Sequence, residues 1–204
     1  MNSIQQTGLL IIIGSLVFVL SAFAMPNINR IYMESSATEK IHIIEDHPGT
    51  WIFHNIMFLL GSTITALSLV ILSSHLENIR GHTWFWLGSI IILVAVIPWD
   101  WHLILRITSP EGFVRNALPG WLFVSFTIFT LVGLGLLGVG FLQSPFPLWL
   151  AWLHIIGAGL LLMLFILLKD MPPFVYYLFT STTGIVSLQQ DTLLKLTTAI
   201  TSGG

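Results

Sequence analysis

The sequence predicts an all-α integral membrane protein, a bundle of six transmembrane helices with a short interfacial helix in the first loop. Three observations lead to this fold class. Hydrophobic residues make up 55% of the 204 residues and charged residues only 8%, whereas a soluble domain carries about 25% charged residues. Uncharged stretches long enough to cross roughly 30 Å of hydrocarbon recur along the chain. They lack the alternation of apolar and polar residues that is typical of membrane barrel strands.

Six apolar stretches account for the predicted spans, and together they form a single membrane domain over residues 1–204. A helix needs about 20 mostly apolar residues, at 1.5 Å of rise each, to cross the hydrocarbon. The last stretch is the shortest and the most polar. The spans are expected at residues 8–25, 51–73, 83–105, 120–142, 148–168 and 172–188.

The loop between the first two spans is expected to contain a short helix that lies along the membrane surface. Ser36 and Glu39 have the spacing of a capping box, in which each side chain satisfies a free backbone N–H of the other residue. After this start, isoleucines and polar residues fall on opposite faces, which is typical of an interfacial helix. The sequence HPGT at residues 47–50 ends the helix, and Thr50 is expected to cap the second span.

The basic residues indicate an orientation for the bundle. Five of them lie in the odd-numbered loops and two on the side that holds both termini. Because cytoplasmic loops carry an excess of Lys and Arg, the odd-numbered loops are predicted to be cytoplasmic and the termini external. The five are Arg30, Lys40, Arg106, Arg115 and Lys169, and the two are Arg80 and Lys195.

Small and polar residues mark the helix faces that are expected to pack against other helices. Helices in lipid have little hydrophobic drive to associate, so small residues that allow close approach indicate packing faces. The glycines of GLGLLGVG at residues 133–140 likewise indicate a face of an apolar span that packs closely against another helix. The predicted faces are His54, Gly61, Thr65 and Ser68 in the second span, Gly88, Ala95 and His102 in the third, and Ala151, His154 and Ala158 in the fifth.

Two of these histidines predict a site near one membrane face. His54 lies near the start of the second span and His102 near the end of the third. Since sequential spans run antiparallel, the two imidazoles are expected at one depth and pointing toward each other. They are candidates for the axial ligands of a b-type haem. Alternatively, each histidine serves only as a hydrogen-bonding group between helices.

A metal site is the other cofactor hypothesis for this face of the membrane. Nitrogen and oxygen ligands gather there, and imidazole and carboxylate suit zinc, iron or copper. Asp100 is expected to reach the interface, where it pairs with Arg106, orients His54 or His102, or is held by water. The metal candidates are His42, Glu45, Asp46, His47 and Asp100.

Motif searches exclude several function classes and leave three hypotheses. The chain has no cysteine, no HExxH, Walker, kinase or Gly-x-Ser-x-Gly motif and no basic patch, so the sequence assigns no reaction and no nucleic-acid partner. The first hypothesis is a subunit of a larger membrane assembly or homo-oligomer with a histidine-lined site. The second is a haem-binding or metal-binding redox protein that uses His54 and His102. A small transporter or channel ranks last, because the middles of the helices contain almost no ionisable residues.

Overall fold

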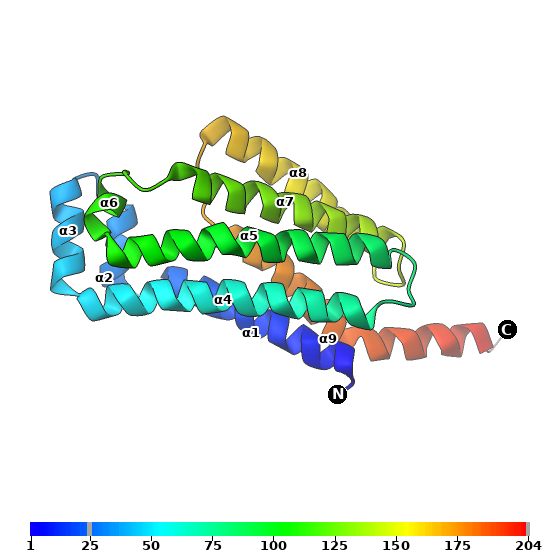
Figure 1. Ribbon diagram of the computed structural model, residues 1–204. Coiled ribbons are helices and arrows are strands. Elements are labelled where there is room, and N and C mark those ends of the chain that lie inside the picture. The colour runs from blue at the N-terminus through cyan, green and yellow to red at the C-terminus, as the bar shows by residue number, and fades with distance from the viewer. Residues whose placement is uncertain (24–25, 203–204) are drawn as a thin grey trace.

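The structure is a computed structural model that describes residues 1–23 and 26–202, with side chains to residue 189 except at residues 26–27. Within these ranges the chain is 84% helical and has no strand, so the all-α prediction is confirmed. Figure 1 shows long helices running side by side. These are α1 (Ser3–Phe23), α4 (Pro48–His75), α5 (His82–Thr108), α7 (Gly120–Leu142), α8 (Leu148–Leu168) and α9 (Phe174–Ser202).

Five of the long helices, α1, α4, α5, α7 and α8, are long and apolar enough to cross a bilayer. By length and composition, the chain is therefore an integral membrane protein. The predicted sixth span corresponds to the first half of α9, which continues as a helix beyond residue 188. It is not one of the five, so a count of six spans stays a prediction. Residues 24–25, the predicted end of the first span, and the side chain of Lys195 lie outside the described part of the chain.

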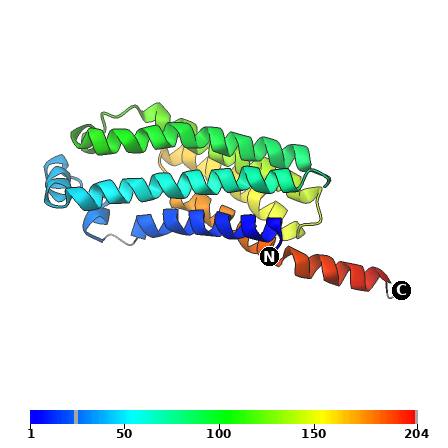
Figure 2. The same ribbon diagram turned by 60° about the horizontal axis from the view of Figure 1, so that its bottom comes forward.

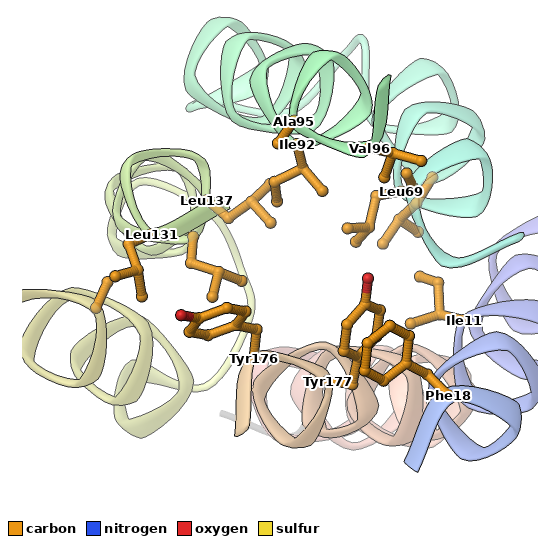
Figure 3. Packing of buried hydrophobic residues seen from close by; sticks show 14 of the residues in the cluster. Ile11, Phe18, Leu69, Ile92, Ala95, Val96, Leu131, Leu137, Tyr176 and Tyr177 are labelled. Carbon is orange, nitrogen blue, oxygen red and sulfur yellow. The ribbon is translucent and has the colours of Figure 1, made fainter. Parts of the chain in front are cut away.

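The long helices surround one apolar core. α1 packs between α4 and α9, α5 packs between α4 and α7, and α8 packs on α7. Figure 2 shows α1, α4 and α5 side by side, with α9 continuing past them at the end where the N-terminus lies. In Figure 3, Tyr176 and Tyr177 point from α9 into the core, where Leu69 and Ile92 meet them from α4 and α5. The core thus joins helices that are far apart in the sequence.

The predicted packing faces are buried between helices, as expected. His54, Gly61, Thr65 and Ser68 are all buried. Gly88 and Ala95 are buried on α5, whereas His102 on the same face is half-buried. A Cβ added to Gly88 would lie 2.7 Å from the carbonyl oxygen of Gly133 on α7. The glycines of residues 133–140 therefore do allow close helix contact.

Short helices lie across one end of the bundle and form what we term the loop cap (Figure 1). The elements of the loop cap are α2 (Pro26–Asn29), η1 (Arg30–Tyr32), α3 (Ala37–Asp46) and α6 (Pro110–Val114). They enclose a second apolar core that contains Ile28, Ile31, Ile43, Ile44, Trp51 and Val114.

The start of α3 confirms one predicted cap, and the start of α4 corrects another. The side chain of Ser36 accepts a hydrogen bond from the backbone N–H of Glu39 at 3.3 Å, which is one of the two bonds of the predicted capping box. The second bond is replaced, because the Ser36 N–H donates to the Glu34 Oε1 at 3.1 Å. Thr50, however, does not cap the second span, because α4 already begins at Pro48 with His47 as its N-cap. Proline is favoured at the first helical position, where its missing N–H costs nothing. The helix therefore starts before the threonine.

Candidate functional site

Arg106 is the central residue of a polar cluster where the bundle meets the loop cap. It lies in the last turn of α5 and is only 3% exposed. Its Nη2 donates a hydrogen bond to the hydroxyl of Tyr32. Its guanidinium carbon is 4.4 Å from the ring centroid of Phe113 and 5.0 Å from that of Trp51, which are cation–π distances. None of the described carboxylates forms an ion pair with it, and its Nε has no hydrogen-bond partner.

His54 belongs to the same cluster through Tyr32. The imidazole is fully buried in α4, and its Nε2 is 3.2 Å from the Tyr32 hydroxyl oxygen. The ring of Phe58 meets it edge-on at 4.6 Å between centroids. Its Nδ1 is buried and forms no hydrogen bond of regular geometry, although the backbone of Ser21 lies nearby. Tyr32 therefore links the imidazole of α4 to the guanidinium of α5.

Trp51 holds the start of α4 against the end of α5, and Asn55 lies one turn further along α4. The Trp51 Nε1–H donates to the carbonyl oxygen of Arg106 at 3.1 Å. Asn55 donates through Nδ2 to the Trp51 carbonyl oxygen at 2.8 Å, while its Oδ1 is buried without a partner. We refer to Tyr32, Trp51, His54, Asn55 and Arg106 as the Arg106 cluster.

His102 lies at the border of the Arg106 cluster. Its ring stacks on that of Trp99, with 5.9 Å between centroids, and its Nδ1 is buried without a partner. Arg106 is close enough to both His54 and His102 for its positive charge to disfavour a second positive charge on either imidazole. Both imidazoles therefore lie at the same end of the bundle. No hydrogen bond or ring contact joins them within the described ranges, and their joint use as cofactor ligands stays a prediction.

Asp100 has different partners from the expected ones. Its Oδ1 is 3.1 Å from the Ser62 Oγ and its Oδ2 is 3.0 Å from the Thr63 Oγ1, two hydroxyls at the middle of α4. It forms no ion pair with Arg106. The pair with Arg106, one of the expected alternatives, is therefore not formed, because the two hydroxyls hold the carboxyl within the α4–α5 pair. The level of Asp100 relative to the membrane interface stays a prediction.

The first-loop candidates for metal binding lie on the outer face of α3. His42, Glu45, Asp46 and His47 are all exposed, and the His42 Nδ1 lies 3.6 Å from the Glu45 Oε2. In the part of the chain that the structure describes, no three His, Cys, Asp or Glu residues come together as a metal site would need. The buried isoleucines of α3 turn these polar residues away from the bundle. A metal site formed by them stays a prediction.

His154 fits the simpler interpretation, a hydrogen-bonding group between helices. It is fully buried on α8. Its Nδ1 lies 2.9 Å from the Leu150 carbonyl oxygen, and its Nε2 lies 3.0 Å from the Thr183 Oγ1 of α9. Because a carbonyl can only accept, Nδ1–H is the donor, and the neutral ring accepts at Nε2 from the threonine. Both ring nitrogens are satisfied, unlike those of His54 and His102.

Sequence reasoning missed Tyr32, Trp51 and Asn55. Asn55 has a visible signal, since it is a second polar residue beside His54 in an apolar span. No sequence signal predicts the role of Tyr32, because only the folding of the loop cap brings this tyrosine to α5. Comparison of the chain with protein-family models, curated proteins and solved structures gives no match.

Proposed function

We propose that this protein is an integral membrane subunit of a larger assembly or homo-oligomer, in which the Arg106 cluster binds an anionic ligand near one membrane face. The observation that carries this proposal is a buried guanidinium without a carboxylate partner among the described residues. Buried charges in proteins are normally paired, because desolvation of a lone charge is costly. An anion would supply the counter-charge and accept a hydrogen bond from the Arg106 Nε, which has no partner.

The chemistry of the cluster favours an oxyanion, and its position favours the phosphate of an anionic lipid headgroup. A guanidinium presents a planar fork of donors that matches phosphate and carboxylate oxygens. The cluster lies near the start of α4 and the end of α5, next to the loop cap. We expect lipid headgroups to surround the protein at this end of the two spans. Tyr32 is half-exposed and covers the guanidinium. The phenol is thus the group that a headgroup would replace or join.

Haem or metal binding by His54 and His102 is the second candidate function. The buried Nδ1 atoms without partners favour it, since imidazole nitrogens are ligands for iron and zinc. The charge of Arg106 acts on both rings and opposes a divalent cation, although it would attract the propionates of a haem. A Soret band in the purified protein would support haem, and bound zinc, iron or copper would support a metal. If the purified protein contains an anionic lipid and neither haem nor a bound metal, the result supports the first proposal, an anionic-ligand site.

The lipid proposal predicts that Arg106→Gln abolishes stabilisation by anionic phospholipid. In mild detergent, phosphatidylglycerol at about 100 times its Kd should raise the Tm of the native chain by roughly 5 °C or more, whereas phosphatidylcholine and inorganic phosphate should not. Arg115→Gln is the matched control, because Arg115 is exposed just after α6 and forms an ion pair with Glu111 at 3.8 Å. An equal loss in both variants, or stabilisation by inorganic phosphate alone, would contradict a headgroup site. Native mass spectrometry of the same sample counts the chains, and single chains only would contradict the assembly.

The histidines provide a separate test of a shared site. His54→Ala and His102→Ala are expected to reduce the same property, the stabilisation by anionic lipid, because both rings lie within the electrostatic influence of Arg106. His154→Ala should leave that stabilisation intact, because the His154 ring forms its hydrogen bonds with Leu150 and Thr183, which do not belong to the Arg106 cluster. Thermal unfolding with and without the lipid measures all three. Loss of the effect in only one of the first two variants would remove the idea of a shared site.

A further inference from the structure

An acidic side chain lies well inside the bundle, in the α4–α5 pair. Asp100 is about 12 Å from the C-terminal end of α5, at 1.5 Å of rise per residue. Its two partners, Ser62 and Thr63, lie at the middle of α4. Ionisable residues within membrane spans are costly and are characteristic of proton or ion pathways. The position of Asp100 therefore indicates a second functional site, separate from the Arg106 cluster.

The surroundings of Asp100 provide hydroxyl groups and no counter-charge. No described Lys, Arg or His forms an ion pair with it. The titratable side chain that faces Asp100 from α9 is Tyr177. Its phenol is buried and interacts electrostatically with the Asp100 carboxyl and with the Ser62 hydroxyl. On the outer side, Leu60 and Ile97 are exposed on α4 and α5. Asp100 is half-buried, so part of its side chain is accessible from outside the bundle.

The hydrogen atoms available around Asp100 allow two protonation states. The Ser62 Oγ has one hydrogen, yet it lies within bonding distance of three acceptors, the carbonyl oxygens of Phe58 and Leu59 at 2.9 Å and the Asp100 Oδ1 at 3.1 Å. If the carboxyl is ionised, Ser62 and Thr63 each donate to one of its oxygens. If it is neutral, its own O–H donates to the Ser62 Oγ, and Ser62 donates to the backbone. The same arrangement satisfies both states.

We propose that Asp100 is a proton-binding site within the membrane. In the neutral state the proton is on Oδ1 and is shared with the Ser62 Oγ, while Thr63 donates to Oδ2. On release, the O–H bond of Asp100 breaks, the proton passes to a water molecule or a buffer base, and the Ser62 hydroxyl rotates to donate to Oδ1. No covalent change of the protein is needed. The Thr63 bond is kept in both states and holds the carboxyl in place.

A hydrophobic carbodiimide tests this proposal, because it reacts with neutral carboxylic acids in lipid. We expect dicyclohexylcarbodiimide to modify Asp100 of the full chain in phosphatidylcholine vesicles, as seen by peptide mass spectrometry, and to leave the exposed Glu45 unmodified. As pH rises, the labelling rate should fall about tenfold per pH unit once the carboxyl ionises. Added sodium ions should not change it. In the double variant Ser62→Ala with Thr63→Ala, labelling should persist to higher pH, because the carboxylate loses both donors.

A carboxyl moved along the same helix provides the matched control. Ile97 is 67% exposed one turn from Asp100, so Ile97→Asp in an Asp100→Asn chain places a carboxyl at a similar depth without the two hydroxyls. This variant should be labelled, which shows that the reagent arrives. The proposal is overturned if Asp100 stays unlabelled while the control reacts, or if its labelling is constant at every pH. Protection by sodium ions at constant pH would also overturn it, in favour of a sodium site. None of these outcomes depends on the Arg106 cluster.

Discussion

Gly61→Leu is expected to separate α1 from α4 and to destabilise the bundle by about 3 kcal/mol or more. A Cβ at this position would lie 2.7 Å from the Phe18 backbone nitrogen and 2.9 Å from the Gly14 carbonyl oxygen. Both are main-chain atoms of α1, so they cannot move unless the whole helix moves. In lipid, close backbone approach provides much of the packing energy between helices. The leucine would therefore push the backbones of α1 and α4 apart and remove the close contact that stabilises the pair.

Gly159→Leu is the matched control for this experiment. Gly159 lies in the middle of α8, is exposed, and has nothing within 4 Å of an added Cβ. The same substitution there should change the Tm little, because the new side chain extends into lipid. Thermal unfolding of both variants in one detergent compares them directly. Equal Tm values for Gly61→Leu and the native chain would show that α1 does not pack on α4 in the membrane.

Trp51→Ala is expected to cost about 3–5 kcal/mol and to release the loop cap from the bundle. The indole is 1% exposed in the core of the loop cap. It stacks on the Arg106 guanidinium and donates to the Arg106 carbonyl oxygen. Its removal therefore deletes apolar contacts and also leaves a buried carbonyl without this donor. Limited proteolysis should cut residues 33–47 faster, and the Tm should fall.

Trp101→Ala controls for the loss of an indole as such. Trp101 is 55% exposed on α5, close to the same end of the bundle, and it belongs to neither core. Its replacement should leave proteolysis of the loop cap unchanged. If both tryptophan variants are cut at the same rate, the loop cap does not depend on Trp51. Stabilisation by anionic lipid should also be lost in Trp51→Ala alone, since the indole forms one wall of the Arg106 cluster.

The helical part of the fold was largely predictable, because it depends on local sequence. Runs of apolar residues between Pro and Gly turns predicted the bounds of α7 and α8 to the residue. The serine at position 36 predicted the start of α3 through a bond that spans three residues. The start of α4 was wrong by a few residues, because Pro48 and Thr50 both fit a helix start and only the first is used.

The candidate site was predictable only in part. The spacing of small residues correctly placed His54 on a buried face, since face membership follows from helical periodicity. Arg106 was considered as a partner of Asp100, but its actual partner, the Tyr32 hydroxyl, was not predicted. Tyr32 reaches the guanidinium through the folding of η1 and α3, which no periodicity encodes. The carboxyl of Asp100 was expected to meet water, and the hydroxyls of a neighbouring helix hold it instead.

From its sequence alone, this protein was determined to be an α-helical membrane chain with its polar side chains on the packing faces of the spans. Hydrocarbon requires each span to satisfy its own backbone hydrogen bonds, so local composition is enough to determine the helices. Only the tertiary structure decided that Tyr32 joins His54 to Arg106 and that Asp100 meets Ser62 and Thr63. Those contacts depend on the relative depth and rotation of neighbouring helices. Depth and rotation follow from the packing of glycines and aromatic rings across the whole bundle, which no single segment contains.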